Sequence, residues 1–151
     1  MNDHGTRLRT LSPVRADTVA APPGSAERNT DKGNLRILVV DDEKLIADTL
    51  THILNRSGFT AVAAHSSAAA LVLAPSLCPD ILLTDVQMPG RNGIETAVLI
   101  REQFAELRVI LLSGQTRSGE MSEAGQQQLN GFELWRKPIH PRELLRRLRA
   151  L

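Results

Sequence analysis

Short apolar runs alternate with amphipathic stretches from Leu35 to the end of the chain, and this alternation constrains the fold more than any other feature. The first run, 35–40, is almost continuously apolar, which is typical of a strand buried on both faces. The stretch that follows repeats apolar residues at helical spacing and ends before Gly58. The predicted strands are 35–40, 59–64, 81–84, 109–112 and 132–136, and the predicted helices are 43–57, 66–74, 94–104, part of 115–130 and the segment from Pro141 onward. Five strands that alternate with five helices favour an α/β fold, a doubly wound parallel sheet with helices on both faces.

Residues 1–34 differ in composition from the rest of the chain. They are rich in Pro, Gly, Ser, Thr, Asp and Arg, and they show no sustained periodicity. Such a segment buries too little apolar surface to offset the conformational entropy that is lost on ordering. We therefore expect a disordered N-terminal extension at 1–34 and one domain at 35–151.

Composition and charge narrow the functional classes. The chain has 151 residues and a formal net charge of +1, which argues against a strongly charged surface for nucleic acid or membrane. No apolar run approaches the roughly 18–20 residues that a membrane-spanning helix needs. The single cysteine, Cys78, excludes an internal disulfide, and we expect its side chain to be buried. We therefore expect a cytoplasmic protein that has neither nucleic acid nor membrane as a partner.

Polar residues stand where four of the predicted strands end. These residues are Asp41 and Asp42 after the first strand, Asp85 after the third, Ser113 after the fourth and Lys137 after the fifth. In doubly wound sheets, ligands bind outside the carboxyl ends of the strands. An acid pair, a third acid, a hydroxyl and a lysine along one edge of the sheet therefore predict a single site.

These residue types suit phosphoryl transfer that depends on a metal ion. Carboxylates held close together repel one another, and Mg²⁺, which prefers oxygen ligands, relieves that repulsion. A carboxylate next to the metal can act as a nucleophile toward phosphorus. A lysine ammonium can balance the charge on the transferred group, and a hydroxyl can donate a hydrogen bond to it. Periodicity alone does not say which aspartate is the nucleophile.

Four segments of the sequence resemble the receiver domain family of two-component response regulators. They are LVVDDE at 38–43, ILLTDVQMPGRNGIE at 81–95, VILLSG at 109–114 and WRKPI at 135–139. Each motif is weak by itself, but together their order and spacing match the family over 35–151. The resemblance implies a flavodoxin-like fold, with a five-stranded parallel sheet in the order 2-1-3-4-5 and five helices.

The resemblance also assigns roles to the acidic residues. Asp85 matches the aspartate that accepts the phosphoryl group. Asp42 matches a direct Mg²⁺ ligand, and Asp41 matches a ligand that acts more through water. Gln87 stands where a backbone carbonyl completes the metal shell in this family. The implied cofactor is therefore Mg²⁺, held by these three carboxylates and the Gln87 carbonyl.

The resemblance assigns the remaining polar residues to the phosphoryl group itself. Lys137 matches the lysine that pairs with this group, and a cis peptide bond is implied between Lys137 and Pro138. Ser113 matches the switch hydroxyl. The family often places an aromatic partner for that hydroxyl three positions before the lysine, but this position is Leu134 here. The aromatic residue is Trp135, which strand alternation points to the opposite face, so the usual aromatic form of the switch is not expected.

The expected function is that of a stand-alone receiver, which a sensor histidine kinase or a histidine phosphotransfer protein phosphorylates on Asp85. Such a protein is not an enzyme toward other substrates, because it transfers phosphoryl only to and from its own aspartate. Its downstream target would be a protein, and the last strand and helices offer a surface for a homodimer. Two alternatives stay open. One is a receiver-like interaction module that signals without phosphate. The other is a Mg²⁺-dependent phosphohydrolase, which usually carries a second aspartate where this chain has Gln87.

Overall fold

The structure of the chain is a computed structural model that describes residues 34–114 and 131–151. Five parallel strands in these ranges form one sheet in the order β2-β1-β3-β4-β5. They are β1 Arg36–Val40, β2 Thr60–Ala64, β3 Ile81–Asp85, β4 Arg108–Ser113 and β5 Glu133–Arg136. Each strand overlaps its predicted range, and the order is the one that the resemblance implied. The helix predicted within 115–130, and the predicted extension before Asn34, lie outside the described residues.

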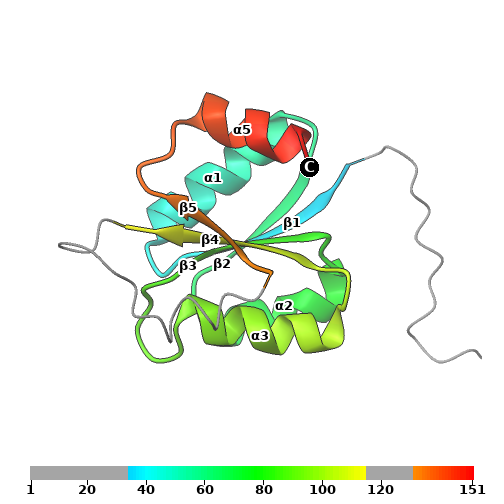
Figure 1. Cartoon of the computed structure of the whole chain (residues 1–151), viewed down its shortest axis with the longest axis vertical. Coiled ribbons are helices and arrows are strands. Elements are labelled where there is room, and N and C mark those ends of the chain that lie inside the picture. Colours follow the sequence, from blue (N-terminus) through cyan, green and yellow to red (C-terminus); the bar gives the residue numbers. More distant parts are fainter. Residues whose placement is uncertain (1–33, 115–130) are drawn as a thin grey trace, which may run out of the picture. The chain divides into compact units, whose positions relative to one another are not determined.

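Four helices of the described residues cover the two faces of the sheet (Figure 1). They are α1 Lys44–Arg56 and α5 Pro141–Arg149 on one face, and α2 Ser67–Leu77 and α3 Gly93–Gln103 on the other. Because helices cover both faces, the inner strands have no solvated side, and β3 is buried at every position. The doubly wound architecture predicted from the alternating pattern is therefore confirmed.

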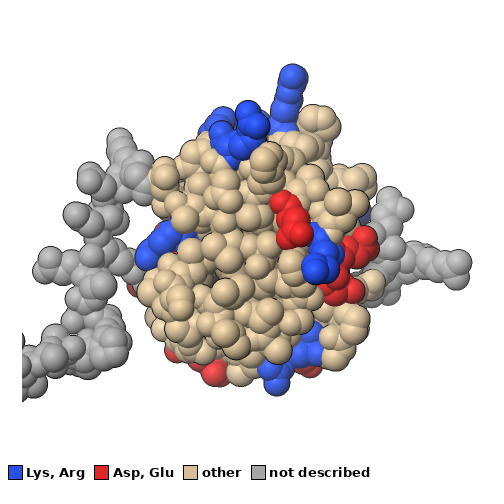
Figure 2. All heavy atoms as spheres, turned by 180° about the vertical axis from the view of Figure 1, so that it is seen from behind, with Lys and Arg blue, Asp and Glu red and all other residues tan. Residues whose placement is uncertain are grey.

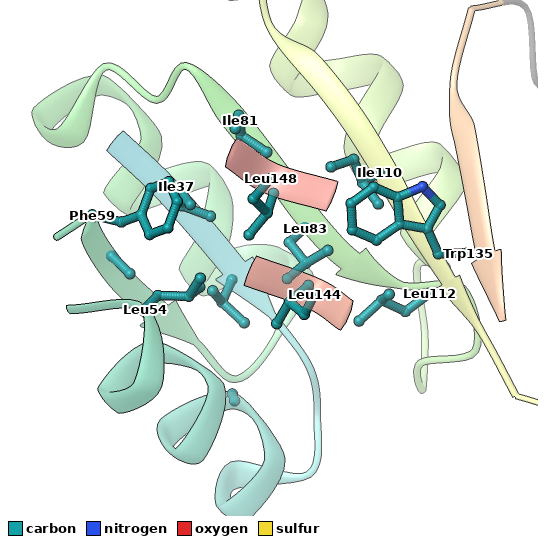
Figure 3. Close-up of a cluster of buried hydrophobic side chains, with 13 residues drawn as sticks. Ile37, Leu54, Phe59, Ile81, Leu83, Ile110, Leu112, Trp135, Leu144 and Leu148 are labelled. Carbon is teal, nitrogen blue, oxygen red and sulfur yellow. The ribbon is translucent and has the colours of Figure 1, made fainter. Parts of the chain in front are cut away.

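The sheet separates two hydrophobic clusters. On the side of α1 and α5, strand residues such as Ile37 and Leu83 pack with Leu144 and Leu148 of α5 (Figure 3). On the side of α2 and α3, the cluster contains Leu38 and other strand residues, with Ala70, Ala74 and Ile100 from the helices. Adjacent strand residues therefore enter opposite clusters, as the two-residue period of a strand requires. Small alanines let α2 lie close to the sheet.

Local sequence sets the limits of the helices that flank the site. α3 begins with a capping box, in which the Asn92 side chain accepts a hydrogen bond from the Glu95 N–H and the Glu95 carboxylate accepts one from the Asn92 N–H. α1 ends before Gly58, whose φ of 95° lies in the left-handed region that favours glycine. The loops after β1 and β3 lie at the same edge of the sheet because these two strands are parallel neighbours.

Two expectations about α2 are wrong. The sequence predicts that this helix ends at residue 74, directly before Pro75, but the helix continues through Pro75 to Leu77, and the Cys78 N–H bonds to the Ala74 carbonyl at 2.8 Å. Pro75 removes one N–H near the end of the helix, on an exposed side where water can hydrate the carbonyl left unpaired. Cys78 is exposed rather than buried, because it caps the helix in a left-handed conformation with a φ of 49°.

Among the described residues, no helix is long and apolar enough to cross a membrane.

Candidate functional site

The carboxyl ends of β1 and β3 lie side by side, and this brings the predicted acidic residues together. Val40 of β1 pairs with Thr84 of β3. The next residue on each strand is an aspartate, so Asp41 and Asp85 lie at the same height on adjacent strands. The ligand oxygens of Asp41, Asp42 and Asp85 all lie within 4.8 Å of one another. Asp41 and Asp85 are buried, whereas Asp42 is exposed. The structure therefore assembles an acidic cluster that opens to solvent on the Asp42 side.

Lys137 reaches this cluster from the end of β5. Its Nζ lies 3.1 Å from Asp41 Oδ2 and 3.4 Å from Asp85 Oδ1. The backbone N–H of Lys137 donates to the Ser113 carbonyl at 2.8 Å, which ties the loop after β5 to the end of β4. The Lys137–Pro138 peptide bond is cis, as the resemblance implied. The Lys137 ammonium thus contacts two carboxylates. All three residues are more than forty positions apart in the sequence.

Burial and charge shift the proton affinities of this pair. The pKa of Asp85 is raised, first because burial disfavours its carboxylate and also because the Asp41 charge lies close, although Lys137 and the Gln87 backbone N–H oppose the shift. Burial alone would lower the pKa of Lys137, but its hydrogen bond to Asp41 and the charges of the two aspartates outweigh that effect and raise it. Lys137 is therefore a cation at neutral pH, held between two acids.

The donor set fits a hard divalent cation such as Mg²⁺. Two oxygens on opposite sides of one Mg²⁺ ion are about 4.2 Å apart, because each Mg–O distance is about 2.1 Å. The carboxylate oxygens of Asp41, Asp42 and Asp85 already lie within 4.8 Å, so small side-chain movements or bridging waters would let them share one ion. An excess of carboxylates over the single ammonium of Lys137 also leaves negative charge for a cation to neutralise.

Two further predicted site residues lie near the cluster with other contacts. Ser113 is the last residue of β4, and its hydroxyl donates to the Gly114 carbonyl at 3.0 Å. Rotation about its Cα–Cβ bond would free this hydroxyl for another acceptor. Gln87 is exposed in the loop after β3, and its backbone N–H hydrogen-bonds the Asp85 carboxylate. The expected role of the Gln87 carbonyl stays a prediction.

Gly93 holds the loop after β3 against the site, and the sequence reasoning missed it. A Cβ at Gly93 would lie 1.9 Å from the Asp85 carbonyl oxygen, so only glycine fits there. The Gly93 N–H donates to the Val86 carbonyl at 3.0 Å, which closes the loop. Behind it, the buried hydroxyl of Thr96 donates to Ser67 Oγ at 2.7 Å and joins α3 to α2. In the sequence, the close approach at Gly93 could have been recognised from the Asn-Gly pair that begins seven residues after Asp85.

An apolar groove of about 530 Å³ opens beside Lys137. Its lining includes Ile46 and Leu50 of α1, with Pro138 and Ile139 from the segment that joins β5 to α5. Ile46 and Leu50 are among the apolar residues at helical spacing from which the first helix was predicted. Both are half-buried, and they form one wall of the groove. An exposed apolar surface thus adjoins the charged cluster.

The positions of Leu134 and Trp135 agree with the prediction from strand alternation. Trp135 is buried in the α1 and α5 cluster, with Arg147 stacked 5.2 Å from its ring centroid, whereas Leu134 is 37% exposed. The one aromatic side chain of β5 therefore lies in the core on the α5 side.

His65 has a partner that its sequence position does not reveal. Its Nε2 lies 2.7 Å from Asp48 Oδ1, which connects the end of β2 to α1. His140 accepts from the Arg142 N–H and caps α5. Both histidines have structural contacts outside the acidic cluster.

Comparisons with known proteins agree with this fold. The family model for the response regulator receiver domain matches residues 37–149. The chemotaxis protein CheY4 of Vibrio cholerae is 25% identical with a TM-score of 0.68, and the match covers 78% of this chain and 98% of CheY4. A receiver domain protein from Clostridium thermocellum is 28% identical with a TM-score of 0.67, over 77% of this chain and 92% of that one.

A third solved structure is more similar in sequence. The two-component transcriptional regulator AraC from Clostridium phytofermentans is 33% identical with a TM-score of 0.63, and the match covers 78% of this chain and 90% of that one. The order of the strands and the family match agree with one another over the same residues. This chain therefore belongs to the response regulator receiver domain family of two-component systems.

Proposed function

We propose that this receiver domain accepts a phosphoryl group on Asp85 from a sensor histidine kinase or a histidine phosphotransfer protein, and signals through changed contacts with other proteins. The observation that carries the proposal is Lys137, whose Nζ lies 3.4 Å from Asp85 Oδ1 and 3.1 Å from Asp41 Oδ2. An ammonium that contacts two buried acids can also contact the negatively charged oxygens of a phosphoryl group attached to either of them.

Asp85 is the better nucleophile of the two. Both acids have hydrogen-bond or ionic contacts, but the Asp85 side chain is 12% exposed and that of Asp41 only 2%, so a phosphodonor reaches Asp85 more readily. In the proposed transfer, a carboxylate oxygen of Asp85 forms a bond to phosphorus while the P–N bond of the donor phosphohistidine breaks. The leaving imidazole takes up a proton from solvent. Lys137 then balances charge on the phosphoryl oxygens, and the Ser113 hydroxyl turns from Gly114 to donate to one of them.

The residues that would hold Mg²⁺ are Asp42, Asp41 and Asp85, with the backbone carbonyl of Gln87. When bound, the ion supplies positive charge that offsets the repulsion between these acids and the incoming phosphoryl group. Asp42 is the exposed member of the cluster, so its side chain can adjust to the ion at little cost.

The apolar groove beside Lys137 is our proposed docking surface for the phosphodonor. A donor histidine has to approach Asp85 closely, and the groove lies next to the lysine that contacts this residue. Apolar side chains of the donor would cover Ile46, Leu50 and Pro138. The protein would act in the cytoplasm, where such donors present their phosphohistidine, and it would transfer phosphoryl to and from its own Asp85 without acting on other substrates.

The test is intact-mass measurement of the full chain after incubation with acetyl phosphate, with and without Mg²⁺. We expect the wild type to gain one phosphoryl group only when Mg²⁺ is present, and Asp85→Asn to gain none. Asp48→Asn is the matched control, since Asp48 is an exposed acid of α1 that pairs with His65 outside the cluster. An adduct on Asp85→Asn equal to that of the wild type would refute the proposal. A wild type that gains no adduct from acetyl phosphate or from a phosphorylated kinase would favour a module that signals without phosphate.

A further inference from the structure

The stretch 57–79 is the longest in the chain without Lys, Arg, Asp or Glu, and it contains both β2 and α2. Every other described helix carries charged residues of both signs. One face of the molecule has a broad central area without charge, with charged side chains around its margin (Figure 2). A surface helix without any charge differs from the usual solvated helix face, because charged side chains normally fill such positions.

The apolar part of this surface is exposed. Val72 of α2 is 75% exposed, and Ala68 and Pro75 lie on the same side of the helix, at positions four before and three after it. On β2, Thr60 is exposed and Val62 is half-buried. We call these five residues the neutral face. Exposed apolar side chains that gather on one surface are a feature of interaction sites.

The free edge of β2 adds a second, independent observation. β2 is the first strand of the sheet and pairs only with β1, so its outer backbone groups have no partner strand among the described residues. Proteins usually protect such edges with lysine, proline or inward-pointing charge. The strand Thr60–Ala64 has none of these, which leaves both the edge and the adjoining helix face open to another chain.

We propose that the neutral face binds the same face of a second copy of this chain, about a twofold axis beside α2 and the β2 edge. In a twofold contact each residue meets its own copy or a near neighbour, so any charge in the patch would face a like charge. The neutral face is free of that repulsion and needs no ion to be desolvated. A charged partner, by contrast, would find no complementary charge there. This surface is separate from the last strand and helix, where charged side chains form ion pairs or stacks instead of an apolar face. They are Glu133 of β5 and Glu143, Arg146 and Arg147 of α5.

The test is the oligomeric state of the full chain, measured by sedimentation equilibrium over a concentration series. Val72→Glu places a carboxylate opposite its own copy and is expected to raise the dimer dissociation constant at least about 100-fold. Leu45→Glu is the matched control, because Leu45 of α1 is also highly exposed, at 80%, but lies outside the neutral face. It is expected to leave the dissociation constant unchanged. Circular dichroism melting of both variants confirms that they remain folded.

Cys78 supplies a second measurement, because it is the only cysteine of the chain and is exposed at the end of α2. Spin labels on Cys78 are expected to show dipolar coupling between copies in the wild type and in Leu45→Glu, and to lose it in Val72→Glu. A chain that stays monomeric at every concentration overturns the proposal. This is the result expected if another part of the same chain covers the neutral face. A dimer that survives Val72→Glu, as one formed through β5 and α5 would, overturns it equally.

Discussion

Gly93 lies so close to Asp85 that a Cβ on it would come within 1.9 Å of the Asp85 carbonyl oxygen. The first turn of α3 therefore rests directly on the end of β3, and the loop between them is held at the acidic cluster. We predict that Gly93→Ala lowers the free energy of unfolding by about 1–3 kcal/mol, because the added methyl forces the backbone apart. Urea denaturation measures this change.

Gly114→Ala is the control for that substitution. A Cβ at Gly114 meets nothing within 4 Å, so we expect a change within about 0.5 kcal/mol. Equal losses in the two variants would mean that the close approach of α3 to β3 is not what makes Gly93 necessary.

Lys137→Met is predicted to destabilise the protein by about 1–3 kcal/mol at neutral pH, because two buried acids lose their shared cation. Lys137 lowers the pKa of Asp85, so its removal raises that pKa further. A group with a raised pKa in the folded state contributes stability below its unfolded pKa and loses it as pH rises through the folded value. The loss should therefore be larger at pH 8 than at pH 4 in urea titrations. Lys44→Met, at an exposed position of α1, should show no such dependence on pH.

Asp85→Asn is predicted to raise the melting temperature in buffer without divalent ions at neutral pH. The pKa of Asp85 is raised by its burial and by Asp41, so its ionised form costs stability above the folded pKa. Mg²⁺ should raise the melting temperature of the wild type more than that of Asp85→Asn, because a ligand that binds only the folded state stabilises it and the variant has lost one anionic ligand. Calorimetry with and without Mg²⁺ measures both effects. A variant that melts below the wild type in metal-free buffer would contradict the stated cause of the shift.

Trp135→Ala is predicted to cost about 3–5 kcal/mol, because it removes a large buried side chain from the α1 and α5 cluster. Leu134→Ala, one residue earlier on the exposed side of β5, is expected to cost less than about 1 kcal/mol. Circular dichroism in urea suits both variants, since Trp135 is the only tryptophan and its loss removes the fluorescence signal. Similar costs for the two would show that the side chains do not alternate as the structure has them.

Much of this fold could be predicted from local pattern. The inner strands are apolar because both faces are covered, so β1, β3 and β4 stand out in the sequence, and their ends mark Asp41, Asp85 and Ser113. The helix cap at Asn92 and the stop before Gly58 also follow from local chemistry. These features depend on neighbours in sequence or on the two periods of helix and strand.

The remaining features depend on contacts between distant segments. The sequence predicted that Lys137 and Asp41 share a site, but their direct contact at 3.1 Å depends on β5 lying beside β4, and the Gly93 contact depends on α3 turning onto β3. The pairing of His65 with Asp48 likewise joins two elements that sequence spacing does not connect. Pro75 was misjudged because a proline near the end of a helix removes only one bond, which water replaces. Such contacts are set by tertiary packing rather than by local preference.

The most direct test of the account is to identify the residue that carries the phosphoryl group. After phosphorylation with acetyl phosphate and Mg²⁺, borohydride reduces an aspartyl phosphate to homoserine, and tandem mass spectrometry of the digested protein locates it. We predict homoserine at position 85, in place of Asp85, and at no other aspartate. Homoserine at position 41 or 42, or none at any position after a phosphoryl adduct has formed, would contradict the central claim.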